Sequence, residues 1–137
     1  WVVTNTSRFE TAISQNGISD WRMFFGTSDI GFHFSPDQIG GDPWSNEGEY
    51  RVKSPLNYAP EVTTPMMFIH SLHDYRCWID QSIQFYTALK YLGKEARLAL
   101  SMEGSHVFRT LSKPSIRRRR LEIMLEWFDD HLKSATE

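Results

Sequence analysis

Apolar residues in the second half of the chain change from one periodicity to another. Residues 66–69 form a continuous apolar run after Pro65, which is typical of a strand buried on both faces of a parallel sheet. Residues 80–92 carry apolar side chains at helical spacing, and Gly93 follows as a stop signal. Residues 96–102 then alternate between apolar and polar types, which predicts another strand.

The end of the chain predicts a long helix over residues 115–132. We expect it to bury one apolar face, made of Leu121, Met124, Leu125, Phe128 and Leu132. The order strand, helix, strand, helix indicates a parallel sheet covered by helices. The predicted fold class is therefore α/β, with a mostly parallel sheet of about three strands flanked by helices.

The first half of the chain is less regular. Residues 9–15 predict a short strand, and residues 18–25 a short aromatic-rich helix. Prolines and glycines interrupt residues 26–60, so we expect a long irregular excursion with one or two short helices there. Long excursions in a compact domain are usually functional.

Two polar residues stand just past predicted strands, where open parallel sheets bind their ligands. Asp74 follows the first of these strands and His106 follows the second. A carboxylate that orients an imidazole is two-thirds of a nucleophilic triad, and the order Asp then His fits the α/β hydrolases. On position alone, a helix-capping Asp74 and an ordinary loop histidine explain the pattern equally well.

The chain contains no G-x-S-x-G nucleophile motif. Ser28 lies in a segment where Ile30 occupies the closing glycine position, and Ser105 is adjacent to the candidate base. Cys77 is a rival nucleophile, but a free cysteine is more often a small apolar wall residue.

No metal or other cofactor is expected. His70 and His73 lie near Asp74, but at a strand end that does not align them, and no second ligand cluster stands out. The net charge of −2 argues against a nucleic-acid partner, and no apolar run approaches the ~20 residues of a membrane span. The arginines at 117–120 are interpreted as solvated surface, paired with Glu122 and Glu126.

Several stretches of the chain resemble the prolyl oligopeptidase family of serine peptidases, in its acylaminoacyl-peptidase and dipeptidyl-aminopeptidase-like branch. They are residues 24–29, 40–44, 54–60, 70–77 and 104–106. The resemblance implies that residues 1–137 are the C-terminal part of an α/β-hydrolase catalytic domain, starting just after the nucleophile elbow. The N-terminal propeller and the first half of the hydrolase domain would then be absent.

The resemblance also implies roles for individual residues. Asp74 would be the acid and His106 the base of a Ser-Asp-His triad whose serine lies upstream, with residues 1–4 continuing the helix after it. The acyl-side pocket would consist of Ile18, Trp21, Phe24 and Cys77, and Arg76 would contact a substrate carbonyl.

The chain departs from the family at two positions near the acid. Ser71 replaces a usual glycine and Trp78 a frequent proline, which alters the acid-bearing loop and the pocket mouth.

The expected function is hydrolysis of short peptides or of N-acylated or N-terminal peptide bonds in the cytoplasm. The 137-residue chain alone should be inactive, and it should form a homo-oligomer or associate with the missing N-terminal part because it leaves a strand edge open. The alternatives are a carboxylesterase or lipase of the same fold, and a non-catalytic interaction fragment.

Overall fold

A three-stranded parallel sheet forms the centre of the molecule. The computed structural model describes residues 1–132, and the strands lie in the order β1 (Ala12–Gln15), β2 (Met66–Ser71) and β3 (Ala96–Ser101). Met66 is aligned with Ala12 on one side and with Ala96 on the other. The predicted α/β class, the three strands and their parallel direction are therefore confirmed.

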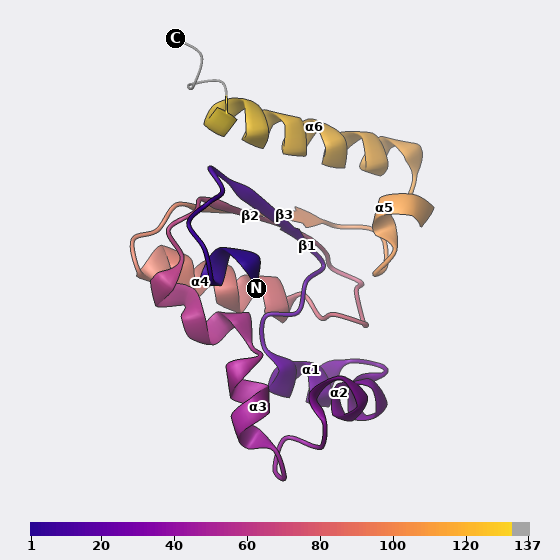
Figure 1. Cartoon of the computed structure of the whole chain (residues 1–137). Coiled ribbons are helices and arrows are strands. Elements are labelled where there is room, and N and C mark those ends of the chain that lie inside the picture. The colour runs from indigo at the N-terminus through magenta and orange to yellow at the C-terminus, as the bar shows by residue number, and fades with distance from the viewer. Residues whose placement is uncertain (133–137) are drawn as a thin grey trace.

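The middle strand β2 is buried on both faces, as its continuous apolar run predicts. All six of its residues are buried, and successive side chains point to opposite faces of the sheet. Met66 and Phe68 pack with residues of α4 (Asp80–Tyr91), while Met67 and Ile69 pack beneath α6 (Pro114–Leu132). Figure 1 shows these two helices on opposite sides of the sheet.

Helix α6 buries only part of the apolar face that the sequence predicts. Leu121, Leu125 and Leu132 are 50%, 63% and 47% exposed in the structure, so these three members of the face are wrong, whereas Met124 and Phe128 pack against the core as predicted. Trp127 is only 4% exposed and packs with Phe108, which lies in α5 (Phe108–Leu111). The helix carries two apolar stripes, and the stripe with the large indole faces β2. The partly buried residues of that stripe are Ile116, Ile123, Met124 and Phe128.

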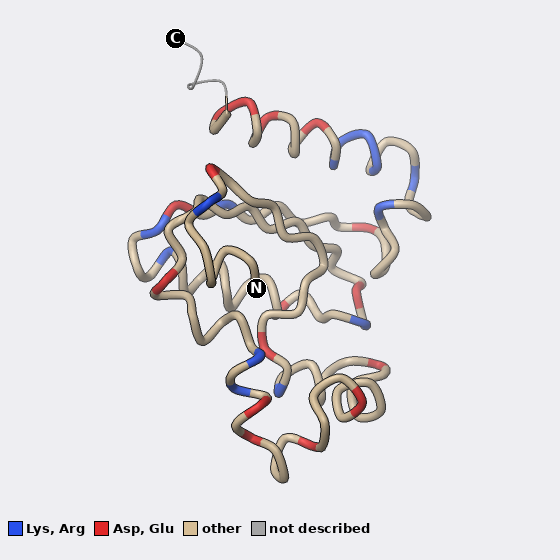
Figure 2. Tube along the Cα trace, in the orientation of Figure 1, with Lys and Arg blue, Asp and Glu red and all other residues tan. Residues whose placement is uncertain are grey.

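The charges on α6 run against its helix dipole. Figure 2 shows basic residues at its start and acidic residues further along, the reverse of the favourable order. Arg118 and Arg119 offset this order by pairing with Glu122, and Arg119 also pairs with Glu126 at 2.9 Å, as the sequence predicted. Arg120 instead donates to the side chain of Gln15 in β1.

The region predicted as irregular, residues 26–60, is mostly helical. It holds part of α1 (Trp21–Thr27), then α2 (Gly31–Ile39), α3 (Glu47–Val52) and most of the 3-10 segment η2 (Pro55–Glu61). Some of the glycines and prolines that suggested irregular structure lie at helix ends, such as Gly40 and Pro55, while Pro36 lies within α2. Gly40 has a φ of 90° and ends α2, a left-handed conformation that glycine adopts without steric cost.

These helices gather at one end of the sheet (Figure 1). A further 3-10 turn, η1 (Val2–Thr4), packs against η2 beside α4. No helix described for residues 1–132 combines the length and apolar character that a membrane span requires.

The packing of α6 predicts a contrast between two of its apolar residues. Trp127→Ala should lower the free energy of unfolding by about 3 kcal/mol, because it empties the space over β2. Leu125→Ala should change it by less than about 0.5 kcal/mol, because that side chain is mostly exposed. Urea unfolding of the two variants checks this, and equal losses would contradict the assigned face.

Candidate active site

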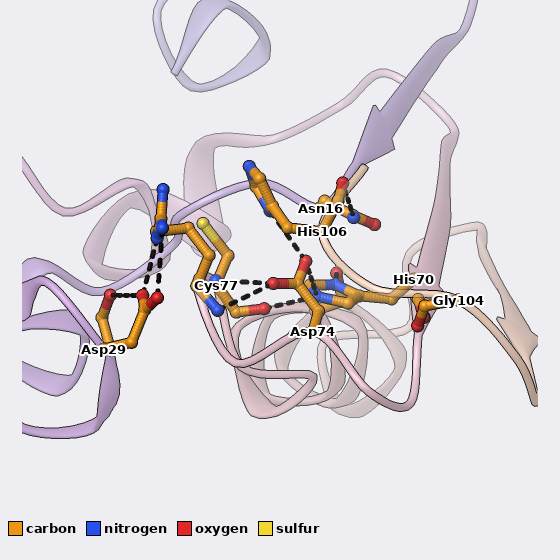
Figure 3. Close-up of polar contacts among 11 residues, drawn as sticks. Asn16, Asp29, His70, Asp74, Cys77, Gly104 and His106 are labelled. Carbon is orange, nitrogen blue, oxygen red and sulfur yellow. Dashed lines mark hydrogen bonds and ion pairs between the residues drawn. The ribbon is translucent and has the colours of Figure 1, made fainter. Parts of the chain in front are cut away.

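The structure brings Asp74 and His106 together across the ends of β2 and β3. His106 Nδ1 lies 2.9 Å from Asp74 Oδ2, as Figure 3 shows. Asp74 is 1% exposed, whereas the His106 side chain is 37% exposed. A carboxylate only accepts hydrogen bonds, so Nδ1 of His106 donates to it. In the neutral imidazole this places the lone pair on Nε2, which is the tautomer that a general base requires.

The other oxygen of Asp74 organises the loop that follows it. Oδ1 accepts hydrogen bonds from the backbone N–H groups of Arg76, at 3.0 Å, and Cys77, at 2.9 Å. An aspartate that binds the backbone two and three residues ahead fixes a tight turn. Asp74 therefore fixes this turn and also pairs with His106. It does not cap a helix, because α4 begins at Asp80 after Ile79.

His70 also helps to hold the loop after Asp74 in place. The sequence analysis did not assign it this role. Its Nε2 is 2.7 Å from the carbonyl oxygen of Cys77 and 3.4 Å from Asp74 Oδ2, and its Nδ1 is 2.7 Å from Ser82 Oγ. The carbonyl only accepts, so Nε2 of His70 donates to it. His70 is fully buried, so these bonds are not shared with solvent.

The described residues do not form a metal centre at this point. Both ring nitrogens of His70 are engaged by protein groups, and His73 is exposed. Among residues 1–132, no group of three His, Cys, Asp or Glu side chains is placed to hold a metal ion.

The environment keeps Asp74 ionised. Burial raises the pKa of the Asp74 carboxyl, but hydrogen bonds from His70 and His106 outweigh it, so the pKa lies below its usual value. The carboxylate is thus charged at neutral pH and able to stabilise an imidazolium.

Cys77 has the opposite behaviour. Burial, followed by the nearby charge of Asp74, raises the pKa of the Cys77 thiol to about 12. The side chain is 5% exposed, so Cys77 is a neutral, buried residue rather than an activated nucleophile. Its place in a substrate pocket stays a prediction. In Figure 3 its sulfur lies on the same side of Asp74 as the His106 ring, where a pocket residue is expected.

Arg76 connects the acid-bearing loop to the helical segment. Its Nε and Nη2 donate to the two carboxylate oxygens of Asp29 at 2.6 and 3.1 Å, and the N–H of Asp29 donates to the carbonyl of Tyr75. The ion pair raises the pKa of Arg76 and lowers that of Asp29. The predicted contact of Arg76 with a substrate carbonyl stays a prediction.

The aromatic residues of the predicted pocket wall contact one another, and Phe34 joins them although the sequence did not indicate it. Trp21 meets the edge of Phe24 at 5.6 Å between ring centres, and Phe34 of α2 stacks on Trp21 at 6.3 Å. Phe24 is only 1% exposed and forms the floor of this group. Ile18 and Trp21 also line a shallow hollow on the surface.

Gln81 of α4 binds the backbone just before α1, the helix that carries Trp21 and Phe24. Its Oε1 accepts from the N–H groups of Ser19 and Asp20, both at 2.8 Å, and its Nε2 donates to the carbonyl of Asp20. Asp20 in turn caps α1 by accepting from the N–H groups of Arg22 and Met23. A buried amide on α4 thereby fixes where the Trp21 helix begins.

The fold and this pair of side chains define part of an α/β-hydrolase catalytic domain. The model of the prolyl oligopeptidase family matches residues 1–135, and the chain belongs to that family. The predicted family is confirmed.

Known proteins resemble the chain over nearly its whole length. An acylaminoacyl peptidase of Pyrococcus horikoshii superposes with a TM-score of 0.93 at 44% identity, covering 97% of this chain and 22% of that one. The uncharacterized peptidase YuxL of Bacillus subtilis (strain 168) is 39% identical, covering 96% of this chain and 20% of its own length. The human acylamino-acid-releasing enzyme is 27% identical over 92% of the chain and 18% of its own length. The chain thus spans about a fifth of these relatives.

The lowered pKa of Asp74 predicts a pH-dependent contribution to stability. Ionised Asp74 stabilises the fold above its unfolded pKa of about 3.9, and this contribution disappears as the pH falls through the lower folded value. Asp74→Asn should therefore cost about 2 kcal/mol at pH 7 and less at pH 3.

Thermal unfolding at the two pH values measures this difference. Asp37→Asn, which changes an exposed carboxylate on α2, is the matched control and should differ from the unmodified protein by less than about 0.5 kcal/mol. A gap for Asp74→Asn that stays constant from pH 7 to pH 3 would contradict the assignment.

Proposed function

We propose that this chain supplies the acid and the base of a serine peptidase. The observation that carries the proposal is the 2.9 Å contact between a buried, ionised Asp74 and Nδ1 of His106, which leaves Nε2 as the basic nitrogen of the neutral ring. Membership of the prolyl oligopeptidase family supports the same chemistry, because its relatives named above are peptidases. The reaction class is acyl transfer to a serine hydroxyl.

In the proposed mechanism, His106 moves protons and Asp74 stabilises the charge. Nε2 of His106 takes the serine hydroxyl proton while the serine oxygen bonds to the scissile carbonyl carbon. Asp74 keeps its position against Nδ1 and stabilises the imidazolium. When the C–N bond breaks, the imidazolium protonates the leaving amine. Water then attacks the acyl group, giving a proton to His106 that returns to the serine as the product leaves.

The proposal assigns the nucleophile to a segment outside these 137 residues. The sequence contains no G-x-S-x-G motif, and the Cys77 thiol is held neutral by its raised pKa. The chain also matches only about a fifth of the length of its relatives. The isolated chain is accordingly inactive in this proposal.

Association with the missing part, or self-association, stays a prediction, as does a cytoplasmic location. The outer edge of β1 supports association, because β1 pairs only with β2 among the described strands.

The proposed substrates are short or N-acylated peptides. Ile18, Trp21, Phe24 and Cys77 would form the wall for the acyl-side residue, and Arg76 would bind a substrate carbonyl through its free N–H groups. A related acylaminoacyl peptidase was solved with Z-Gly-Gly-Phe-chloromethyl ketone, a blocked peptide. Its match to this chain at 44% identity supports a peptide substrate here.

Replacing the proposed base tests the function directly. In the longer protein that carries this chain, His106→Ala should lower kcat by at least ~10⁴-fold, because the serine loses its proton acceptor. Hydrolysis is measured with N-acylated peptides and with ester substrates, since preference for esters would favour a carboxylesterase or lipase. His73→Ala, an exposed histidine on the same loop, is the control and should keep its activity. Peptidase activity retained by His106→Ala would overturn the proposal.

The position of the nucleophile has its own test. A fluorophosphonate probe labels activated serines, and intact mass reports each adduct. The 137-residue chain should stay unlabelled, while the longer protein should gain one adduct. Labelling of the short chain would place the nucleophile among its own serines, against the proposal.

A further inference from the structure

The loop that follows β3 and carries His106, residues 102–107, is joined to the ends of the other two strands by side-chain hydrogen bonds. We call this segment the base loop. Asn16 Nδ2, at the end of β1, donates to the carbonyl of His106 at 2.8 Å. Ser71 Oγ, at the end of β2, donates to the carbonyl of Gly104. Figure 3 shows Asn16 and Gly104 near the Asp74–His106 pair.

Asn16 is held in the orientation that this bond requires. Its backbone N–H donates to the carbonyl of Ile69, which adds one more bond after the paired residues of β1. Its φ of 48° lies in the left-handed region, which asparagine tolerates better than other residues with a Cβ. Asn16 is 9% exposed, so its amide donates to His106 with little competition from water.

Ser71, the last residue of β2, also binds the base loop. It is fully buried and aligned with Ser101 of β3, three residues before Asp74. The acceptor residue Gly104 has a φ of 103°, and a Cβ there would lie 2.5 Å from the Cβ of Phe108. The loop therefore turns tightly at Gly104, which fixes the direction of the carbonyl that Ser71 binds.

Packing contributes little to holding the base loop. Met102, Glu103, Ser105 and Val107 are exposed, and the first large buried side chain after the loop is Phe108. Ser101 and Lys113 bind the loop at Glu103, on the exposed surface. The contacts nearest the imidazole are those of Asn16 and Asp74 to His106 and of Ser71 to Gly104. A misplacement of about 1 Å at a catalytic group costs up to ~100-fold in rate.

We propose that Asn16 and Ser71 are positioning residues that hold the base loop so that the His106 imidazole stays aligned with Asp74. This inference rests on the proposed function for its kinetic consequence.

The kinetic test uses near-isosteric changes in the longer protein that carries this chain. Asn16→Asp removes the amide donor and places an acceptor against the His106 carbonyl, and should lower kcat by ~10- to 100-fold with KM within about twofold. Ser71→Ala should lower kcat by roughly fivefold. Asn46→Asp is the matched control, because Asn46 Nδ2 also donates to a carbonyl, that of Gly40 at 2.7 Å, away from the base loop. It should keep kcat within about twofold.

A second readout is independent of catalysis. The Nδ1 proton that His106 shares with Asp74 should give a downfield proton NMR resonance, which Asn16→Asp broadens or removes and Asn46→Asp preserves. An unchanged resonance and unchanged kcat in Asn16→Asp would overturn the inference, as would equal losses in the control. If the unmodified protein hydrolyses no peptide, the proposed function fails, and the resonance alone decides the positioning role. If Asn16→Asp is unfolded at the assay temperature, Ser71→Ala carries both readouts.

Discussion

The described structure depends on burying one ionised carboxylate at the end of the central strand. Asp74 is 1% exposed, and an isolated charge in such a place is very costly. Donors from Arg76, Cys77 and His106, with His70 close by, compensate that cost. The turn after β2 supplies the N–H groups of Arg76 and Cys77 to the Asp74 carboxylate, and the base loop supplies the His106 imidazole. His70 lies beside the same carboxylate.

The layers of the fold place these donors. Strand β2 is covered by α4 on one face and α6 on the other, so its last residues are fixed before the chain reaches Asp74. Helix α4 then contributes Ser82, which binds His70, and Gln81, which binds the segment before α1. A single helix therefore supports both the acid and the aromatic wall.

Strong local patterns made much of this predictable. Strand β2, helix α4 and the pair Asp74–His106 follow from continuous apolar runs, helical spacing and the shared edge of parallel strands. The roles of Gln81 and Asn16 could not be predicted, because each side chain binds backbone that is 61 or more residues away in sequence. The buried face of α6 was predicted only in part. Met124 and Phe128 pack against the core as expected, but Trp127 and Ile123 take the place expected for the leucines, and only contact with the sheet distinguishes these positions.

The contact between Arg76 and Asp29 and the contact between Asp74 and His106 differ in how strongly dissolved ions weaken them. Both side chains are about half exposed, at 40% and 48%, so dissolved ions screen their attraction. The carboxylate of Asp74 is sealed from solvent and its bond to His106 is largely spared. Rising ionic strength therefore weakens the contact between Arg76 and Asp29 well before it weakens the contact between Asp74 and His106, so the two ends of the acid-bearing loop respond differently to salt.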